Sequence, residues 1–323
     1  MKKNTVVVGV LYCLISVLAW GGMFPVMRVA LQNMDPFYFT TIRYLAAGLV
    51  FLILLAIFEG KKAFRLEDKT WKLLFFGAAG FSGFGFLVFA GQKLSGPSGA
   101  IIASVMMALM PLMTVFVNWG VKKVKPTSFN FISILIALTG SLLVITNGDF
   151  SVLLQAKSNL FADLLILLGA LCWVIYTMGG GQFVGWSPLR YTTLTTCFGT
   201  LVNILIVALG TALGLLTIPS LDKLFAATPE LLYMILIAGV LAVFTWNVGN
   251  KILKPTNGVL FMNIVPVTTV TISMIQGVGI GAAQLTGILI VISALVMNNL
   301  IQRWISRTTL SSKRNSLKIK DSM

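Results

Sequence analysis

The side chains that carry most enzyme and metal chemistry are scarce in this sequence of 323 residues. It contains no histidine, and Asp and Glu together number nine. Only Asp163 among these acids lies inside a long apolar run, and no carboxylate pair, Cys/His cluster or phosphate-binding glycine loop occurs. The three cysteines lie in apolar runs and are interpreted as small hydrophobic residues. We therefore expect neither an enzyme nor a metal or cofactor site.

Three charged residues lie within the apolar runs and not at the first residue of a run: Arg28, Arg43 and Asp163. A charge in the middle of a bilayer costs about 2.5–3.5 kcal/mol on insertion scales, so such residues usually face a cavity or a partner. One interpretation is that an arginine binds the carboxylate or phosphate of a substrate. The other is structural, in which Arg43 pairs with Asp163 or Asp35, or an arginine extends to the membrane surface. The sequence leaves both open.

A second group of candidates combines three tryptophans in the middle of apolar runs with a tyrosine and three amides. The residues are Trp20, Trp173, Tyr176, Trp246, Asn247, Asn250 and Asn263. Polar amides are costly in lipid unless they are paired, so these side chains should face the protein interior. We expect them either to line a neutral, aromatic-walled substrate cavity or to pack and bridge helices.

The elements that must position these residues are membrane helices. The chain is 57% hydrophobic and 10% charged, with a mean hydropathy of +0.94, which is far too apolar for a soluble domain. Ten apolar runs each reach the roughly 17–25 residues that cross a bilayer as a helix. The runs are 6–29, 36–58, 72–92, 97–119, 128–147, 160–179, 190–213, 230–250, 255–276 and 282–302. We therefore predict an all-α membrane protein with ten transmembrane helices.

Lysines and arginines in the short connections predict the orientation. Nineteen fall on one side of the membrane and three on the other, namely Lys93, Lys157 and Lys223. The richer side holds both termini, so we expect a multi-pass protein of the bacterial cytoplasmic (inner) membrane with both termini in the cytoplasm. Four tryptophans at the predicted cytoplasmic helix ends resemble an aromatic belt, namely Trp71, Trp119, Trp186 and Trp304. The net charge of +15 is then explained by topology and anionic lipid, not by nucleic acid.

Two stretches 158 positions apart share the same order of Gly, amide, Lys and Pro: Gly91–Gly99 and Gly249–Asn257. Each is followed by an apolar run with an interior proline, Pro111 or Pro266, which should kink its helix. Paired interrupted helices at matching places in two halves point to the binding site of a transporter. Because five helices per unit is an odd number, the second unit must be inverted. The predicted units are 1–147 and 148–305, followed by a basic cytoplasmic tail at 306–323.

Six short segments look like the matching helices of a known family. They are Leu18–Pro25, Phe39–Tyr44, Phe161–Leu164, Trp173–Tyr176, Lys254–Gly258 and Asn263–Pro266. Over essentially the whole chain they resemble the EamA-like, ten-helix branch of the drug/metabolite transporter superfamily. The resemblance implies export of amino acids or other small metabolites, while relatives carry nucleotide sugars or triose phosphates. Many relatives place Glu before the proline of the ninth helix, whereas Val265 stands there in this chain, so a coupling role for that carboxylate is not carried over.

These features together predict a transporter that moves small polar or amphiphilic metabolites by alternating access, with amino-acid export favoured. One alternative is a nucleotide-sugar or phosphorylated-metabolite exchanger, which would need more cations at its cavity than Arg28 and Arg43. Another is a non-transporting membrane scaffold or sensor. The expected partners are a small-molecule substrate and membrane lipid, with the chain as a monomer or homodimer. With no histidine and no acid deep in a helix, we expect facilitated diffusion or exchange instead of proton coupling.

Overall fold

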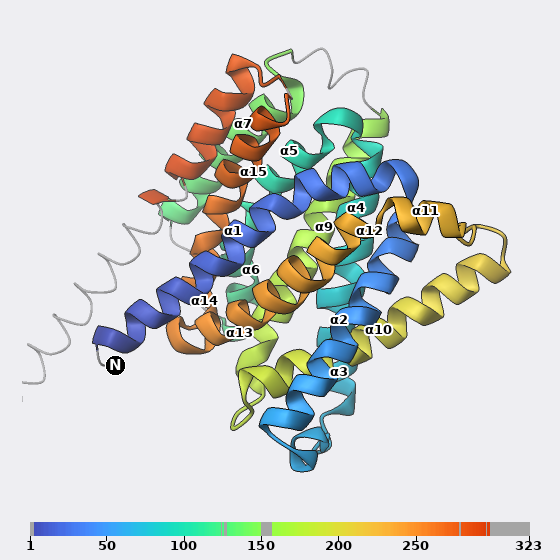
Figure 1. Cartoon of the computed structure of the whole chain (residues 1–323). Coiled ribbons are helices and arrows are strands. Elements are labelled where there is room, and N and C mark those ends of the chain that lie inside the picture. The colour runs from blue at the N-terminus through green and yellow to red at the C-terminus, as the bar shows by residue number, and fades with distance from the viewer. Residues whose placement is uncertain are drawn as a thin grey trace, which may run out of the picture.

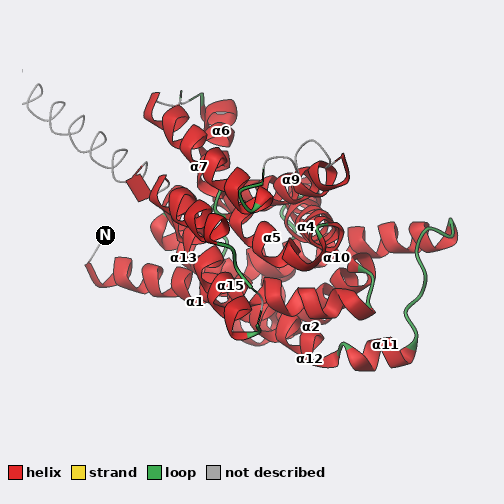
Figure 2. Cartoon of the chain, turned by 90° about the horizontal axis from the view of Figure 1, so that it is seen from above, coloured by secondary structure: helices red, strands yellow, loops and turns green. Residues whose placement is uncertain are grey.

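The computed structural model describes residues 3–123, 125, 128–149, 157–277, 279–294 and 296–297, and the regular structure in these ranges is helical (Figure 1, Figure 2). Within these ranges, seven helices are long and apolar enough to cross a membrane, or eight if one bent pair counts as a single span. The chain is therefore a multi-pass membrane protein. The expected tail at 306–323 and Trp304 lie outside the described residues.

The elements follow one another along the chain as helices joined by short connections. In the first part they are α1 (Lys3–Asn33), α2 (Pro36–Phe58), α3 (Thr70–Gly77), α4 (Phe84–Leu94), α5 (Gly99–Met107), α6 (Met110–Lys122) and α7 (Ser128–Thr146). In the second part they are α9 (Lys157–Gly179), α10 (Pro188–Ala212), α11 (Leu221–Ala226), α12 (Thr228–Leu232), α13 (Ala242–Leu253), α14 (Pro255–Gly258), α15 (Ile264–Ile275) and a last helix over Ala282–Ala294.

Two of the long helices start with the same local chemistry. Asp35 caps α2 by accepting a hydrogen bond from the Phe37 amide, and Pro36 occupies the first turn. At the start of α10, the Ser187 hydroxyl accepts from the Arg190 amide, and Pro188 follows it. A side-chain acceptor followed by proline satisfies the free amides of a first turn and fixes where the helix begins.

Several spans depart from regular α-helix at defined places. A π-helical stretch, Ala78–Gly83, joins α3 to α4, and another, Tyr233–Leu241, joins α12 to α13. A break at Ala108 and Leu109 bends α5 against α6 by 46°, and a 3₁₀ stretch over Val259–Asn263 precedes α15. Pro111 and Pro266 lie in the first turns of α6 and α15, directly after these interruptions, where a proline has no backbone hydrogen bond to remove.

The long helices pack in pairs that join distant parts of the sequence. In Figure 1, α1 runs beside α13, and α4 runs beside α9. Both pairs approach closely at a glycine: a Cβ on Gly91 would lie 2.6 Å from the Ala162 carbonyl oxygen, and one on Gly249 would lie 2.5 Å from Cys13 Sγ. Small residues at such crossings let membrane helices come into backbone contact. The glycines therefore fix both crossings.

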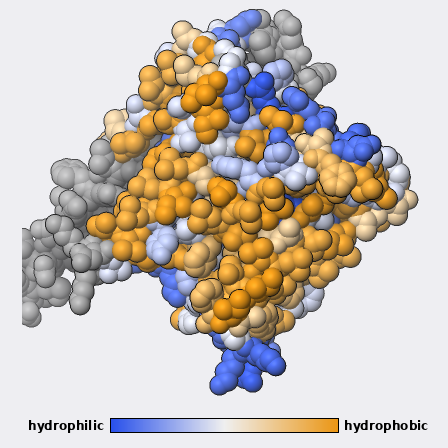
Figure 3. All heavy atoms as spheres, in the orientation of Figure 1, coloured by the Kyte–Doolittle hydropathy of each residue, from blue (hydrophilic) through white to orange (hydrophobic). Residues whose placement is uncertain are grey.

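The outer surface carries a broad band of apolar side chains, with hydrophilic residues gathered toward the upper and lower ends of the view (Figure 3). Large hydrophobic side chains of α2 and α10 point outward along their length, including Leu49, Ile53, Leu205 and Leu209. An exposed apolar band of this kind fits the hydrocarbon interior of a bilayer. Buried aromatic and methionine side chains fill the centre instead.

Candidate functional site

The three mid-helix tryptophans meet in the interior of the molecule. The ring of Trp20 in α1 contacts Trp173 in α9 and Trp246 in α13 at an edge-on angle, with a centroid separation of 5.2 Å in each case. All three side chains are buried. Aromatic contacts of this geometry stabilise packing beyond the burial of area alone. The tryptophans thus tie α1 to two helices from the second part of the chain.

An amide and hydroxyl network lies beside the tryptophans. Trp246 Nε1 donates a hydrogen bond to Thr177 Oγ1 at 3.0 Å. The amide nitrogen of Asn247 donates to the hydroxyls of Tyr176 at 2.7 Å and Thr192 at 2.8 Å. Both hydrogens of that nitrogen are therefore in use, and they join α13 to α9 and α10. Asn247 bridges helices, as one of the two sequence interpretations predicts, and it also borders open space.

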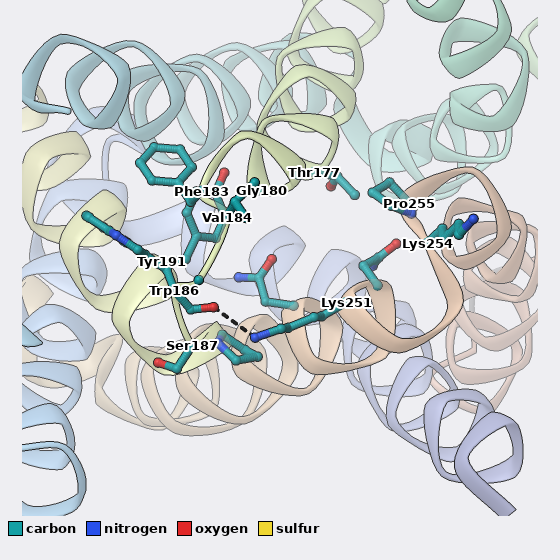
Figure 4. A pocket seen from close by; sticks show the side chains of 15 residues that line it. Thr177, Gly180, Phe183, Val184, Trp186, Ser187, Tyr191, Lys251, Lys254 and Pro255 are labelled. Atoms are coloured by element: carbon teal, nitrogen blue, oxygen red, sulfur yellow. Dashed lines mark hydrogen bonds between the residues drawn. The ribbon is translucent and has the colours of Figure 1, made fainter. Parts of the chain in front are cut away.

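That open space is a cavity of about 380 Å³ at the end of the molecule where α9 passes into α10 and α13 into α14 (Figure 4). The buried side chains of Thr177, Asn247 and Asn250 line it, together with the exposed Lys251 and Lys254. The described lining residues include no carboxylate. Its volume suits a small metabolite, and its charge favours an anionic group.

One side of the cavity is bordered by Trp186, which the sequence analysis assigns to an aromatic belt at the membrane surface. The structure buries it: its indole nitrogen donates to Glu67 at 2.7 Å, and its backbone carbonyl accepts from Lys251 Nζ at 2.8 Å (Figure 4). The guanidinium carbon of Arg190 lies 3.9 Å from the ring centroid, and Arg190 also pairs with Glu67 at 2.7 Å. We refer to Glu67, Trp186, Arg190 and Lys251 as the Trp186 latch.

Glu67 is the anionic centre of the Trp186 latch. Hydrogen bonds from Trp186, then from Arg190 and Lys69, lower the pKa of this carboxyl from 4.5 to about 2. They also connect the loop between α2 and α3 to the loop before α10. Sequence reasoning does not single out Glu67, because an acid in a charged loop is unremarkable until the fold supplies its partners.

Arg43 is fully enclosed by aromatic and methionine side chains. Its Nη2 donates to the hydroxyl of Tyr44, while Nη1 faces the sulfur atoms of Met23 at 3.9 Å and Met234 at 3.8 Å. Its Nε has no hydrogen-bond partner. The two ion pairs found in the described part of the chain both belong to Glu67, so Arg43 pairs there with neither Asp163 nor Asp35. Burial also excludes extension to the membrane surface.

The other predicted residues do not all lie at this cavity. Arg28 borders a different cavity of about 250 Å³ together with Gln92 and Lys93. Asp163 is buried in α9, seven residues into that helix. Asn250 donates to the Trp246 carbonyl at 2.9 Å and leaves its own amide oxygen unpartnered, as does the buried Asn263. The structure therefore brings the tryptophans, Tyr176 and Asn247 together, but not Arg28.

Comparison with known proteins identifies the family. The model of the EamA-like transporter family matches this chain twice, over residues 7–146 and 160–300. The chain belongs to the EamA-like transporter family. The match covers both parts of the chain, and with it the helices that carry the tryptophans, Asn247 and Arg43.

Two individual relatives are similar in sequence to this chain over nearly its full length. The uncharacterized transporter YrdR of Bacillus subtilis is 45% identical over 94% of this chain and 94% of its own length. YyaM, another uncharacterized transporter of the same organism, is 31% identical over 87% of this chain and 90% of its own. A crystal structure with 18% sequence identity has a TM-score of 0.65, covering 94% of this chain and 99% of the other, which supports a shared fold.

Proposed function

We propose that the protein transports small metabolites across the bacterial cytoplasmic membrane by alternating access, and that it exports amino acids or related metabolites. It would do so as ten transmembrane helices in two inverted five-helix units, 1–147 and 148–305. The double match of the family model supports two units, because each of its two segments, 7–146 and 160–300, falls within one of these ranges.

The positions of the helix interruptions support the repetition of one unit. The π-helical stretches begin at Ala78 and Tyr233, which are 155 positions apart. The same offset relates the break at Ala108 to Asn263, the last residue of the 3₁₀ stretch before α15. The packing also relates the two units: α4 of the first unit contacts α9 of the second, and α13 of the second unit contacts α1 of the first. Interrupted helices in corresponding places of two halves are typical of transporters that move one unit against the other.

The observation that carries the transport proposal is the contrast between an open end and a closed centre. The cavity beside Trp186 holds about 380 Å³, whereas the space between Trp20, Arg43 and Trp173 holds about 10 Å³. A carrier that alternates its access has a pathway open to one side and closed to the other. In the orientation that the lysine-rich connections predict, the open end faces the cytoplasm. A solute would therefore enter this state from inside the cell.

A second candidate, exchange of phosphorylated metabolites or nucleotide sugars, is favoured by one feature. Lys251 and Lys254 add two cations to the cavity, which the sequence alone does not place there. Phosphate groups are commonly bound by lysine. The scaffold or sensor alternative has no comparable support, since neither role requires an open cavity that ends at a closed centre.

The test is flux in liposomes that contain the purified protein. Vesicles would be preloaded with unlabelled amino acids, and uptake of each labelled amino acid would be followed in exchange, with protein-free vesicles as the control. We expect uptake of a subset of amino acids. Uptake of sugar phosphates or nucleotide sugars alone would favour the second candidate. If neither group of solutes is taken up, the transport proposal fails.

A further inference from the structure

The guanidinium of Arg43 has unused hydrogen-bond donors, and it has no counter-charge among the described residues. Arginine keeps its proton, so it cannot escape the cost of burial by becoming neutral. Its neighbours are thioether sulfurs, which are weak acceptors, and the faces of Tyr44 at 4.1 Å and Phe89 at 5.0 Å. Its Nε–H meets no acceptor at all. A buried cation in this condition lacks an anionic partner.

Tyr44 adds a second free donor at the same place. Its hydroxyl oxygen accepts the hydrogen bond from Arg43, which leaves the hydroxyl proton available. Both residues border the closed central space. An acceptor placed there would receive hydrogen bonds from the guanidinium and from the phenol together. A carboxylate, with two oxygens in one plane, suits that pair of donors.

The other residues that line the central space indicate what the rest of such a ligand would be like. Its walls are apolar and include Trp20, Phe84 and Trp173, with four methionines, Met23, Met107, Met110 and Met262. Methionine side chains are unbranched and can rearrange to admit ligands of different shape. Met107 and Met110 flank the break between α5 and α6, so movement at that bend would enlarge the space.

We propose that Arg43 and Tyr44 bind the carboxylate of a small monocarboxylic solute, whose apolar part lies against Trp20 and Trp173. This rests on the proposed transport function and names the class of solute. A single negative charge balances the one cation among the described residues that border this space, whereas a doubly charged phosphate would leave an excess charge in the interior of the membrane. The site therefore discriminates against phosphorylated solutes, even though Lys251 and Lys254 line the cavity beside Trp186.

A ligand-free measurement separates this role from a purely structural one. If Arg43 is held only by cation–π packing, Arg43→Met should lower the melting temperature of the purified protein. If Arg43 awaits an anion, removing the unpaired charge should leave the melting temperature unchanged or raise it. Arg28→Met serves as the matched control, because Arg28 is only partly buried and borders a different cavity.

The ligand measurement uses matched acids and amides: butyrate and butyramide, hexanoate and hexanamide, L-leucine and L-leucinamide. We expect at least one acid, and not its amide, to raise the melting temperature of the wild-type protein and of Arg28→Met. Arg43→Met should weaken the apparent affinity for that acid by about tenfold or more, and Arg43→Lys by less. The inference is overturned if acids and amides act alike, or if Arg43→Met retains the response to acid.

The result of this binding test can be interpreted separately from the result of the liposome experiment. An acid response that requires Arg43 in a protein without flux would support the binding site and contradict transport. Flux of an amino acid that is unchanged in Arg43→Met, with no acid response, would support transport and contradict this site.

Discussion

Gly96 and Lys254 stand at the same place in the two stretches Gly91–Gly99 and Gly249–Asn257, 158 positions apart, and share an unusual backbone conformation. Each immediately precedes a proline, and their φ angles are +64° and +72°. Glycine adopts positive φ freely, whereas a lysine there is strained. The first stretch thus has a glycine, which suits this backbone conformation, whereas the second has a strained lysine at the edge of the cavity.

The first prediction follows from that strain. Lys254→Gly should stabilise the protein by about 1 kcal/mol, because it relieves a conformation that side chains disfavour. The same substitution should reduce flux if the Lys254 ammonium attracts anionic solutes. Thermal unfolding and uptake would be measured together. Gly96→Ala is the matched change in the other half and should destabilise, so a stabilised Gly96→Ala protein would contradict the account.

The second prediction concerns the Trp186 latch and pH. Because the pKa of Glu67 is lowered in the folded protein, the latch should contribute its full stability above the unfolded pKa of 4.5. The contribution should be lost as the pH falls toward about 2. The melting temperatures of the wild type and Glu67→Gln should therefore differ at pH 7 and converge on acidification. A difference that grows as the pH falls would mean that the carboxylate does not stabilise the latch.

A third prediction tests the amide network. Asn247→Ala would leave the buried hydroxyls of Tyr176 and Thr192 without this donor, at a cost of about 1–3 kcal/mol for a group left unpaired. We expect a lower melting temperature and reduced flux, and reduced flux also for Trp246→Ala and Asn263→Ala. The control is Asn257→Ala, because Asn257 is exposed and its side chain donates to the nearby Leu253 carbonyl. Normal transport by all three variants would place the site elsewhere.

The sequence predicts best what depends on hydrophobic length and local capping. The expected run at 36–58 coincides with α2 because Asp35 and Pro36 define its start chemically. The expected run at 72–92 falls inside the observed span Thr70–Leu94. Periodic apolar residues reveal that a helix meets lipid, but they do not reveal the π-helical stretches Ala78–Gly83 and Tyr233–Leu241.

The candidate site shows the opposite limit. Trp20, Trp173 and Trp246 are recognisable because bulky aromatic residues in mid-helix must pack against something. Trp186 is misassigned to the aromatic belt because a helix-end tryptophan has the same sequence pattern whether it faces lipid or folds over a cavity. The partners of Arg43 likewise depend on α2 meeting three other elements, since Met23 lies in α1, Phe89 in α4 and Met234 in the π-helical stretch after α12. The sequence can therefore suggest an ion pair but cannot exclude one.

A fourth prediction concerns orientation. Single cysteines at Lys61 and Lys123, both exposed, should be protected from membrane-impermeant thiol reagents in intact cells, while cysteines at Asp149 and Lys223 should react. The native cysteines would first be replaced, and labelling in permeabilised cells would show that all four positions are reactive. Reaction of Lys61→Cys from outside would reverse the proposed orientation and contradict the predicted helix order.

The last prediction concerns energy coupling. Coupled carriers place a titratable group where the substrate also binds. Neither the cavity beside Trp186 nor the central space has an acid among its described lining residues. Asp163 lies fourteen residues before Thr177 on α9, about 21 Å along a helix. We therefore expect facilitated diffusion or exchange, with Asp163→Asn retaining flux. A pH step across substrate-loaded liposomes is the measurement. Uphill accumulation that follows the proton gradient and disappears in Asp163→Asn would make Asp163 a coupling residue and contradict this expectation.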